Sequence, residues 1–297
     1  MSRLHVDVDE APAYELLRRL GTDRMPHRNG RTLFEHLSGM ATIAKAWRLP
    51  EDVRRAALFH SVYGTAVYRD GAAHRDRRDT IRAEIGAAAE RLAFAFGGVD
   101  RPRFGAAVEA MALPRECTLT TRFGDVQTLS ARDVVALALL GTINELEQTC
   151  ASDGSPASWR SFCRPLVDAL VRWNVPEVPP FVRATLTVTS QTEAESIAHY
   201  LRAVELVNRD TPAAERAFAD VGRSEVRVAE PFVWQSYLAT RRGDELAATE
   251  FADEARLRLV GWGTPWDKRL TLEDWLEEID GRGATGASRL LQLASPR

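Results

Sequence analysis

The sequence predicts an all-α protein that carries one small β-hairpin and divides into two domains. Apolar residues recur at helical spacing along most of the chain, and residues that favour helix ends lie between these stretches. Residues 118–130 differ, because they are rich in threonine and alternate in the manner of strands. The chain has 297 residues, more than one hydrophobic core usually serves, so two domains are expected.

The N-terminal part predicts three helices in succession. Residues 9–20 carry a stripe of leucines. Thr32 and Glu35 have the spacing of a capping box, so they begin a helix expected over 32–48. A proline and two acidic residues open the third helix, expected over 51–62, because both residue types favour a helix N-terminus.

The remainder of the first domain predicts a hairpin among further helices. The hairpin turns at Phe123-Gly124-Asp125. We expect Gly97-Gly98 to stop the helix before it and Ser130 to cap the helix after it. The four helices are expected at 79–96, 103–112, 131–150 and 156–173.

A proline-rich segment separates the two domains. Its prolines cannot continue a helix, so we place a helical first domain at 1–175, a linker at 176–190 and a repeat-like second domain at 191–297. In the second domain a shift of 34 residues aligns Tyr200 with Trp234, Asp210 with Asp244, and Pro231 with Pro265. This period is typical of tetratricopeptide repeats, which are helix–turn–helix units. A capping helix near 271–280 and a mobile tail after Gly281 complete the prediction.

Composition excludes several classes of protein. The formal net charge of −3 gives no electrostatic case for binding nucleic acid or an anionic membrane. The sequence contains no apolar run near the roughly 20 residues that span a bilayer. The cysteines (Cys117, Cys150 and Cys163) are odd in number and lack metal-site spacing, so we expect a reduced, cytoplasmic protein.

Two histidines form the candidate site. His36 and His60 lie on the apolar faces of consecutive helices joined by a tight turn, so an antiparallel pairing brings their rings together. Imidazole suits a metal or acid–base chemistry. The alternative is a pair of hydrogen-bonded core histidines.

The strings around these histidines resemble the HD-domain superfamily, a group of helical proteins. They are Leu33-Phe34-Glu35-His36-Leu37 and Leu58-Phe59-His60-Ser61-Val62-Tyr63-Gly64-Thr65. Residues 36–148, with Ile85-Gly86, Asp100-Arg101 and Asn144 near Glu147-Gln148, look like an uncharacterised bacterial HD-like family. The resemblance implies a metal at His36 and His60. The chain departs from the HD pattern where Ser61 replaces the paired Asp and Asn144 replaces the later Asp.

Other residues could complete a remodelled site. A carboxylate from Glu145, with His27, His36 and His60, would give a site for one divalent metal such as Zn, Mn or Fe. Tyr63 is a candidate acid, and Asn144 would tune His60. Residues expected to bind a small anionic substrate are Arg75, Arg77 and Ser61. For His27 and the arginines, the alternative is an ordinary solvated surface.

The sequence leaves three functions open. The first is an HD-like enzyme, with metal-dependent hydrolysis of a phosphorylated or other anionic small molecule as the leading reaction. The second is a metal-free or iron-dependent enzyme that uses His36 and His60. The third is a non-catalytic scaffold whose C-terminal helices bind a protein partner.

Overall fold

The computed structural model confirms the all-α class with a single hairpin. It describes residues 10–27, 30–65, 71–73, 75–148, 157–184, 190–225, 227–281 and 288–294. These residues form fifteen α-helices and one two-stranded sheet. They fall into two compact units, one containing described residues up to 148 and 161–178, the other containing 157–160 and the described residues from Pro179 onward.

The first unit opens with three helices that the sequence predicts well. They are α1 (Ala11–Arg19), α2 (Leu33–Ala46) and α3 (Glu51–Phe59). The predicted capping box is present, with Thr32 and Glu35 bonded to each other's backbone N–H groups. Helix α3 is shorter than predicted, because it ends at Phe59 and His60 begins a turn that reaches Gly64, whose φ is 74°.

The structure has two helices where the sequence predicts one. The expected helix over 79–96 divides into α4 (Arg78–Ile85) and α5 (Ala87–Gly98), because Gly86 adopts φ 87° between them. The Gly97-Gly98 pair lies inside α5 rather than after it. A Cβ at Gly97 would stand 2.7 Å from the Gly64 carbonyl oxygen, so this glycine permits close packing of the His60 turn on α5.

The hairpin and the remaining helices of the unit follow. Strands β1 (Cys117–Thr120) and β2 (Val126–Leu129) pair antiparallel and turn through Gly124, so the predicted hairpin is confirmed. Before them, the predicted helix at 103–112 begins earlier, because Asp100 caps it through the Arg103 N–H. The helices are α6 (Arg101–Glu109), α7 (Ala131–Gln148) and α8 (Ala157–Arg172).

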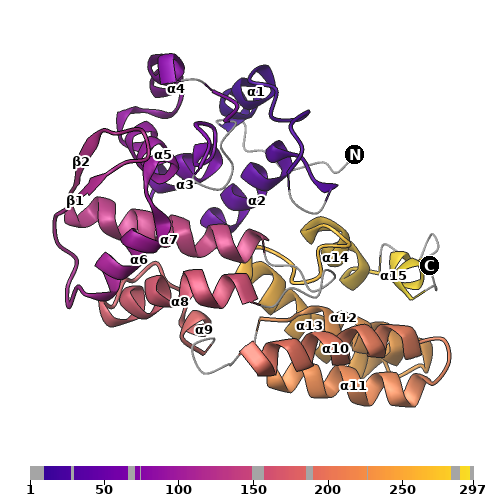
Figure 1. Ribbon diagram of the computed structural model, residues 1–297. Coiled ribbons are helices and arrows are strands. Elements are labelled where there is room, and N and C mark those ends of the chain that lie inside the picture. The colour runs from indigo at the N-terminus through magenta and orange to yellow at the C-terminus, as the bar shows by residue number, and fades with distance from the viewer. Residues whose placement is uncertain are drawn as a thin grey trace. The chain divides into compact units, whose positions relative to one another are not determined.

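Helix α7 organises the core of the first unit. It packs against α2, α3 and α5, and Figure 1 shows it running along the unit beside α8. Its residues from Ala136 to Leu140 are nearly all buried, and so are the polar residues Asn144, Glu145 and Glu147 near its C-terminal end. Burial of three polar groups in one helix requires partners, and these partners form the candidate site.

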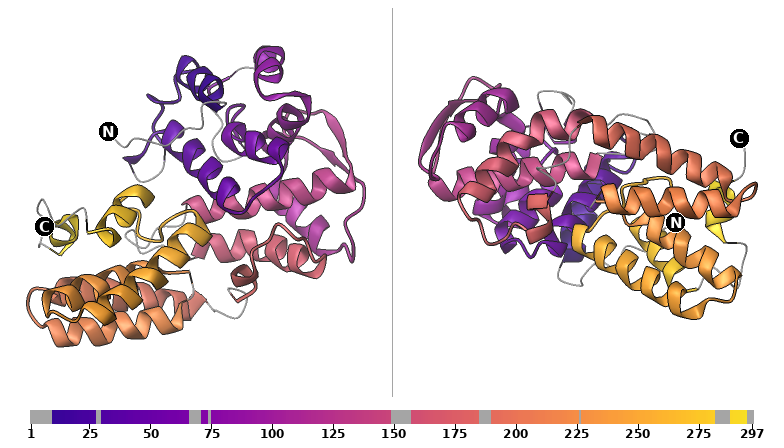
Figure 2. Two further views of the ribbon diagram at one scale, coloured as in Figure 1. Left: turned by 180° about the vertical axis from the view of Figure 1, so that it is seen from behind. Right: turned by 90° about the horizontal axis from the view of Figure 1, so that it is seen from below.

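The second unit consists of helical hairpins. In both views of Figure 2 its orange to yellow helices α10 to α13 run side by side, in agreement with the contacts between consecutive helices. Asp210 and Asp244, 34 residues apart, occupy equivalent N-cap positions and accept from Ala213 and Ala247. The helices are α9 (Pro180–Ala184), α10 (Ser190–Leu206), α11 (Thr211–Ser224), α12 (Glu230–Arg241), α13 (Glu245–Trp262), α14 (Leu272–Ile279) and α15 (Arg289–Leu293).

Two predictions for this part of the chain need correction. Helix α9 lies within the expected linker, because Pro180 occupies the first position of a helix, which proline tolerates. The tail expected to be mobile contains α15, which Ser288 caps and which buries Leu290 in the core of the unit. Residues 282–287 and 295–297 of that tail lie outside the described residues.

Among the described residues, no helix combines the length and apolar character needed to cross a membrane.

Gly97 and Gly105 offer a matched test of the packing around the His60 turn. Gly97→Ala places a methyl group against backbone, so we expect the free energy of unfolding to fall by about 1–3 kcal/mol. Gly105→Ala in α6 meets nothing within 4 Å, so we expect a gain of up to about 1 kcal/mol from helix propensity. Urea denaturation measures both, and equal effects would contradict the packing argument.

Candidate functional site

His36 and His60 meet inside the first unit, as their helical faces predict. The two Nε2 atoms lie 3.1 Å apart, and both side chains are fully buried. Helices α2 and α3 pack against each other, which brings His36 in the first turn of α2 close to His60 at the C-terminal end of α3. The ring planes are inclined at 73°, so the contact is between edges rather than faces.

The outer nitrogen of each ring is fixed by an acceptor. His60 Nδ1 donates to the Ala57 carbonyl oxygen over 2.8 Å, and His36 Nδ1 bonds to the Glu147 carboxylate. Carbonyl and carboxylate oxygens only accept, so both Nδ1 atoms carry hydrogen. A neutral imidazole has one N–H, so in the neutral rings both Nε2 atoms present lone pairs to each other.

Asn144 adds a third acceptor to this meeting point. Its Nδ2 donates to Glu145 over 3.0 Å, which turns its Oδ1 toward His60 Nε2 at 3.1 Å. Gln148 also donates to this oxygen. Two imidazole nitrogens and an amide oxygen therefore converge on one region, which a proton or another cation can bridge.

Glu147 is the residue that sequence reasoning missed. It is 1% exposed and pairs with Arg31 as well as with His36, with Arg31 Nη2 at 3.1 Å from Oε2. Burial acts to raise the pKa of this carboxyl, but His36 and Arg31 outweigh it and hold the pKa at about 2. Gly39 makes room, since a Cβ there would stand 2.7 Å from Glu147 Oε1.

The spacing along α7 contained a signal for Glu147. Residues three apart on a helix share a face, so Glu147 lies on the same side as Asn144. Glu145, the predicted ligand, is one position from Asn144 and points elsewhere. It pairs with Arg101 at 3.3 Å and accepts from the Asn144 amide, so it occupies a different side of the site from the His36–His60 contact.

His27 lies beside the histidine pair but is not directed at its meeting point. Its ring stacks on that of His36 with centroids 4.3 Å apart and planes 7° from parallel. Because the two rings are nearly parallel, the nitrogens of His27 point within their own plane and not toward the His36–His60 contact. The four-ligand set predicted from the sequence is therefore not assembled by His27 and Glu145.

Tyr63 belongs to a separate cluster. Its hydroxyl donates to Glu90 over 3.0 Å, and Arg78 grips the same carboxylate through two nitrogens at 2.6 and 2.9 Å. Burial, together with Glu90, raises the pKa of Tyr63. This bond directs the phenol to Glu90. In the described part of the chain, His60 bonds to His36, Ala57 and Asn144 and not to the candidate acid Tyr63.

The predicted anion-binding residues are only partly placed. Arg77 is exposed just before α4, whereas its neighbour Arg78 points inward to Glu90. The side chain of Arg75 lies outside the described residues. Ser61 is buried in the turn after His60, where its carbonyl accepts from the Gly64 N–H.

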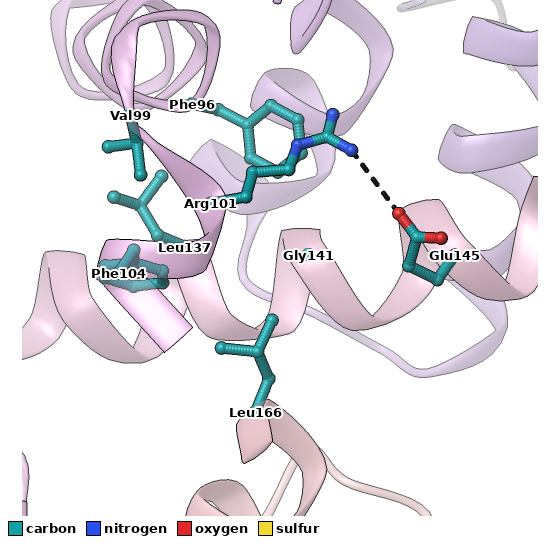
Figure 3. Close-up of a pocket in the computed structure, with 8 residues that line it drawn as sticks. All are labelled: Phe96, Val99, Arg101, Phe104, Leu137, Gly141, Glu145 and Leu166. Carbon is teal, nitrogen blue, oxygen red and sulfur yellow. Dashed lines mark hydrogen bonds and ion pairs between the residues drawn. The ribbon is translucent and has the colours of Figure 1, made fainter. Parts of the chain in front are cut away.

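A small pocket lies next to the histidine pair (Figure 3). Phe96 and Arg101 line one side of it, with the guanidinium directed at Glu145 on α7. The Phe96 ring also contacts the His60 ring edge to face, at 5.0 Å between centroids. Phe96 therefore contacts both His60 and Arg101, whose guanidinium carbon lies 5.0 Å from the centre of its ring.

The side chains around the His36–His60 contact meet some of the requirements of a metal site and miss others. Two nitrogen ligands at 2.0–2.1 Å in tetrahedral geometry stand roughly 3.3 Å apart, close to the observed 3.1 Å. Each histidine also donates its other N–H to an acceptor, as metal-binding histidines do. However, the described residues contain no group of three His, Cys, Asp or Glu side chains suited to a metal. The residues fit a weak site of two imidazoles and one amide.

Comparison with known proteins assigns no activity to the chain. A family model described as "Domain of unknown function (DUF6817)" matches residues 16–101. This is less than a third of the chain, and it includes His36, His60 and Arg101 but not Asn144 or Glu147. No curated protein and no solved structure matches the chain.

The depressed pKa of Glu147 makes a prediction about acid stability. The carboxyl has a pKa of about 2 in the folded protein against an ordinary 4.5, so its ionised form stabilises the fold above pH 4.5 by about 3 kcal/mol. This contribution is lost as the pH falls toward 2. We therefore expect Glu147→Gln to be less stable than the natural protein at pH 6, with a difference that shrinks below pH 4.5.

Urea denaturation at several pH values measures that difference. Glu116→Gln is the control, since Glu116 is an exposed carboxylate in the same unit, and its effect on stability is expected to be small at every pH. A Glu147→Gln difference that stays constant from pH 6 to pH 2 would show that the ionised carboxylate is not the stabilising species.

Proposed function

We propose that the chain is an HD-like enzyme that acts on a small anionic molecule by general acid–base catalysis, with hydrolysis as the reaction and His60 as the base. The observation that carries the proposal is the contact between two buried Nε2 atoms whose rings are each held by an acceptor at Nδ1. Such anchoring fixes the tautomer and leaves the Nε2 lone pairs for chemistry.

The environment of His60 favours a neutral base. Burial lowers the pKa of His60 well below its ordinary value, and the neighbouring His36 and Arg101 lower it further. The imidazole is therefore unprotonated at neutral pH, which a general base requires. Asn144 acts in the opposite direction, because its amide oxygen accepts from a protonated Nε2 and so raises the pKa of His60, but burial outweighs this effect.

His36 and Glu147 supply the support for this base. His60 Nε2, which takes up the proton, lies 3.1 Å from His36 Nε2, so the two rings can share that proton. Glu147, bonded to the far side of His36, offsets the positive charge. Glu147 is thus a positioning residue in the proposal, because it acts through His36 and does not face the meeting point of the rings.

A metal-dependent version of the enzyme is the second candidate. It is favoured by the tautomers of the two histidines and by their separation. His36, His60 and Asn144 would hold the ion, which would lower the pKa of a bound water. No carboxylate joins this set, and Arg101 adds positive charge beside it, so we rank this version below the metal-free one.

The scaffold function and a protein partner remain predictions. Helix α13 exposes Leu246, Leu257 and Val260, which is an observation in favour of a contact surface on the second unit. An inert histidine pair in the assay below would leave this function as the remaining candidate.

Hydrolysis of para-nitrophenyl phosphate and para-nitrophenyl acetate tests the proposal. With the full-length chain in EDTA, we expect His60→Ala to lower the rate on the order of 100-fold or more, because the base is lost. His199→Ala is the matched control, since His199 is an exposed histidine in the second unit. Equal rates for His60→Ala and the natural protein overturn the proposal. Activity lost in EDTA and restored by Zn, Mn or Fe selects the metal-dependent version.

Nitrogen NMR of the imidazoles tests the protonation state directly. We expect His60 in the folded protein to show the neutral form with hydrogen on Nδ1 at pH 7, and to keep it well below pH 6.5 because burial opposes the charge. Glu147→Gln is expected to change the ring signals of His36 more than those of His60. A His60 ring that titrates near the ordinary pKa of 6.5 would contradict the assignment of the base.

A further inference from the structure

The pocket beside the histidine pair combines one guanidinium with an apolar interior. Its polar end holds Arg101 and Glu145, and Phe104, Leu137 and Leu166 line the rest (Figure 3). We propose that this pocket binds a small organic carboxylate, with the carboxylate on Arg101 and a short hydrocarbon group against the apolar side chains. The inference rests on the proposed function and names the anionic part that a substrate of that site would carry.

Arg101 has donors to spare for an anion. Its side chain is 25% exposed, and in the described part of the chain it makes one hydrogen bond, to Glu145 over 3.3 Å. A guanidinium carries five N–H donors in a planar fork that matches the two oxygens of a carboxylate. The guanidinium of Arg101 also lies over the Phe96 ring, with its carbon 5.0 Å from the ring centroid.

Glu145 keeps a hydrogen-bond partner when a ligand carboxylate binds Arg101. Besides the guanidinium, its Oε1 accepts from the Asn144 amide over 3.0 Å. A ligand carboxylate on Arg101 therefore leaves Glu145 with a hydrogen bond instead of an unpaired buried charge. The same amide links Glu145 to His60, since Asn144 Oδ1 lies 3.1 Å from His60 Nε2.

The apolar part of the pocket sets the size of the ligand. Its interior offers about 30 Å³ to the centre of a water molecule, which is space for a few atoms and far less than a drug-sized ligand needs. Gly141 lines this space from the interior of α7, where glycine is a less favourable helix residue than alanine. A Cβ there would stand 2.6 Å from Leu166 Cδ1. A chain of about two to four carbons suits this volume.

The position of the pocket connects the ligand to the chemistry. Phe96 contacts both His60 and Arg101. A molecule whose carboxylate rests on Arg101 therefore lies near the proposed base. This placement favours a short-chain carboxylate over a bare inorganic anion, because phosphate would leave the apolar surfaces uncovered.

Titration of the isotopically labelled full chain with butyrate, followed by NMR, tests the inference. We expect saturable shifts of backbone signals in α6 and α7. The double variant Arg101→Met with Glu145→Gln, which removes both members of the ion pair, is expected to weaken butyrate at least tenfold. Arg103→Met is the matched control, because Arg103 is exposed on the same helix.

Two further probes separate the parts of the ligand. We expect 1-butanol and inorganic phosphate each to bind at least tenfold more weakly than butyrate, and Gly141→Ala to weaken butyrate severalfold by filling the pocket. Thermal melting verifies that each variant folds. Phosphate binding as tightly as butyrate, or butyrate binding unchanged in the Arg101→Met, Glu145→Gln variant, overturns the inference.

This measurement is independent of turnover. Butyrate binding with no hydrolysis by the histidine pair would support the pocket and overturn the proposed chemistry. Hydrolysis that depends on His60 without butyrate binding would support the chemistry and overturn the pocket.

Discussion

The buried carboxylate of Glu147 is the interaction on which the rest of the site depends. It joins α7 to His36 on α2 and to Arg31 in the segment before α2. A buried ion pair adds less to stability than its attraction suggests, because both charges lose their hydration, but it fixes the arrangement of the groups it connects. Here it fixes the orientation of the His36 ring, and through that ring the direction from which His60 is approached.

Most of the first unit could be predicted from local sequence. The capping box at Thr32, the hairpin turn at Gly124 and the pairing of His36 with His60 all follow from spacing and apolar periodicity. Gly86 could not be distinguished from a tolerated helix glycine, because the break depends on its positive φ. The spacing along α7 places Glu147 on the face of Asn144, but the partners that this face meets are set by contacts with distant helices.

The second unit is more regular than its sequence similarity suggests. Few of the side chains aligned by the 34-residue shift are identical, yet Asp210 and Asp244 perform the same capping of successive helices. The buried carboxylate of Glu230 accepts hydrogen bonds from the backbone N–H groups of Trp266 and Asp267, and so holds the segment that follows α13. The N-cap aspartates therefore recur at the 34-residue spacing, although most of the packing side chains at aligned positions differ.

Gly39 has a consequence for how this site can change. The glycine supplies the volume that the Glu147 carboxylate occupies, although the two residues lie on different helices. A larger residue at position 39 and a shorter acid at position 147 would each leave the site misfitted, whereas together they could restore contact. We therefore expect the residues at positions 39 and 147 to vary together. A sequence in which only one of them differs would lose the contact between the carboxylate and His36.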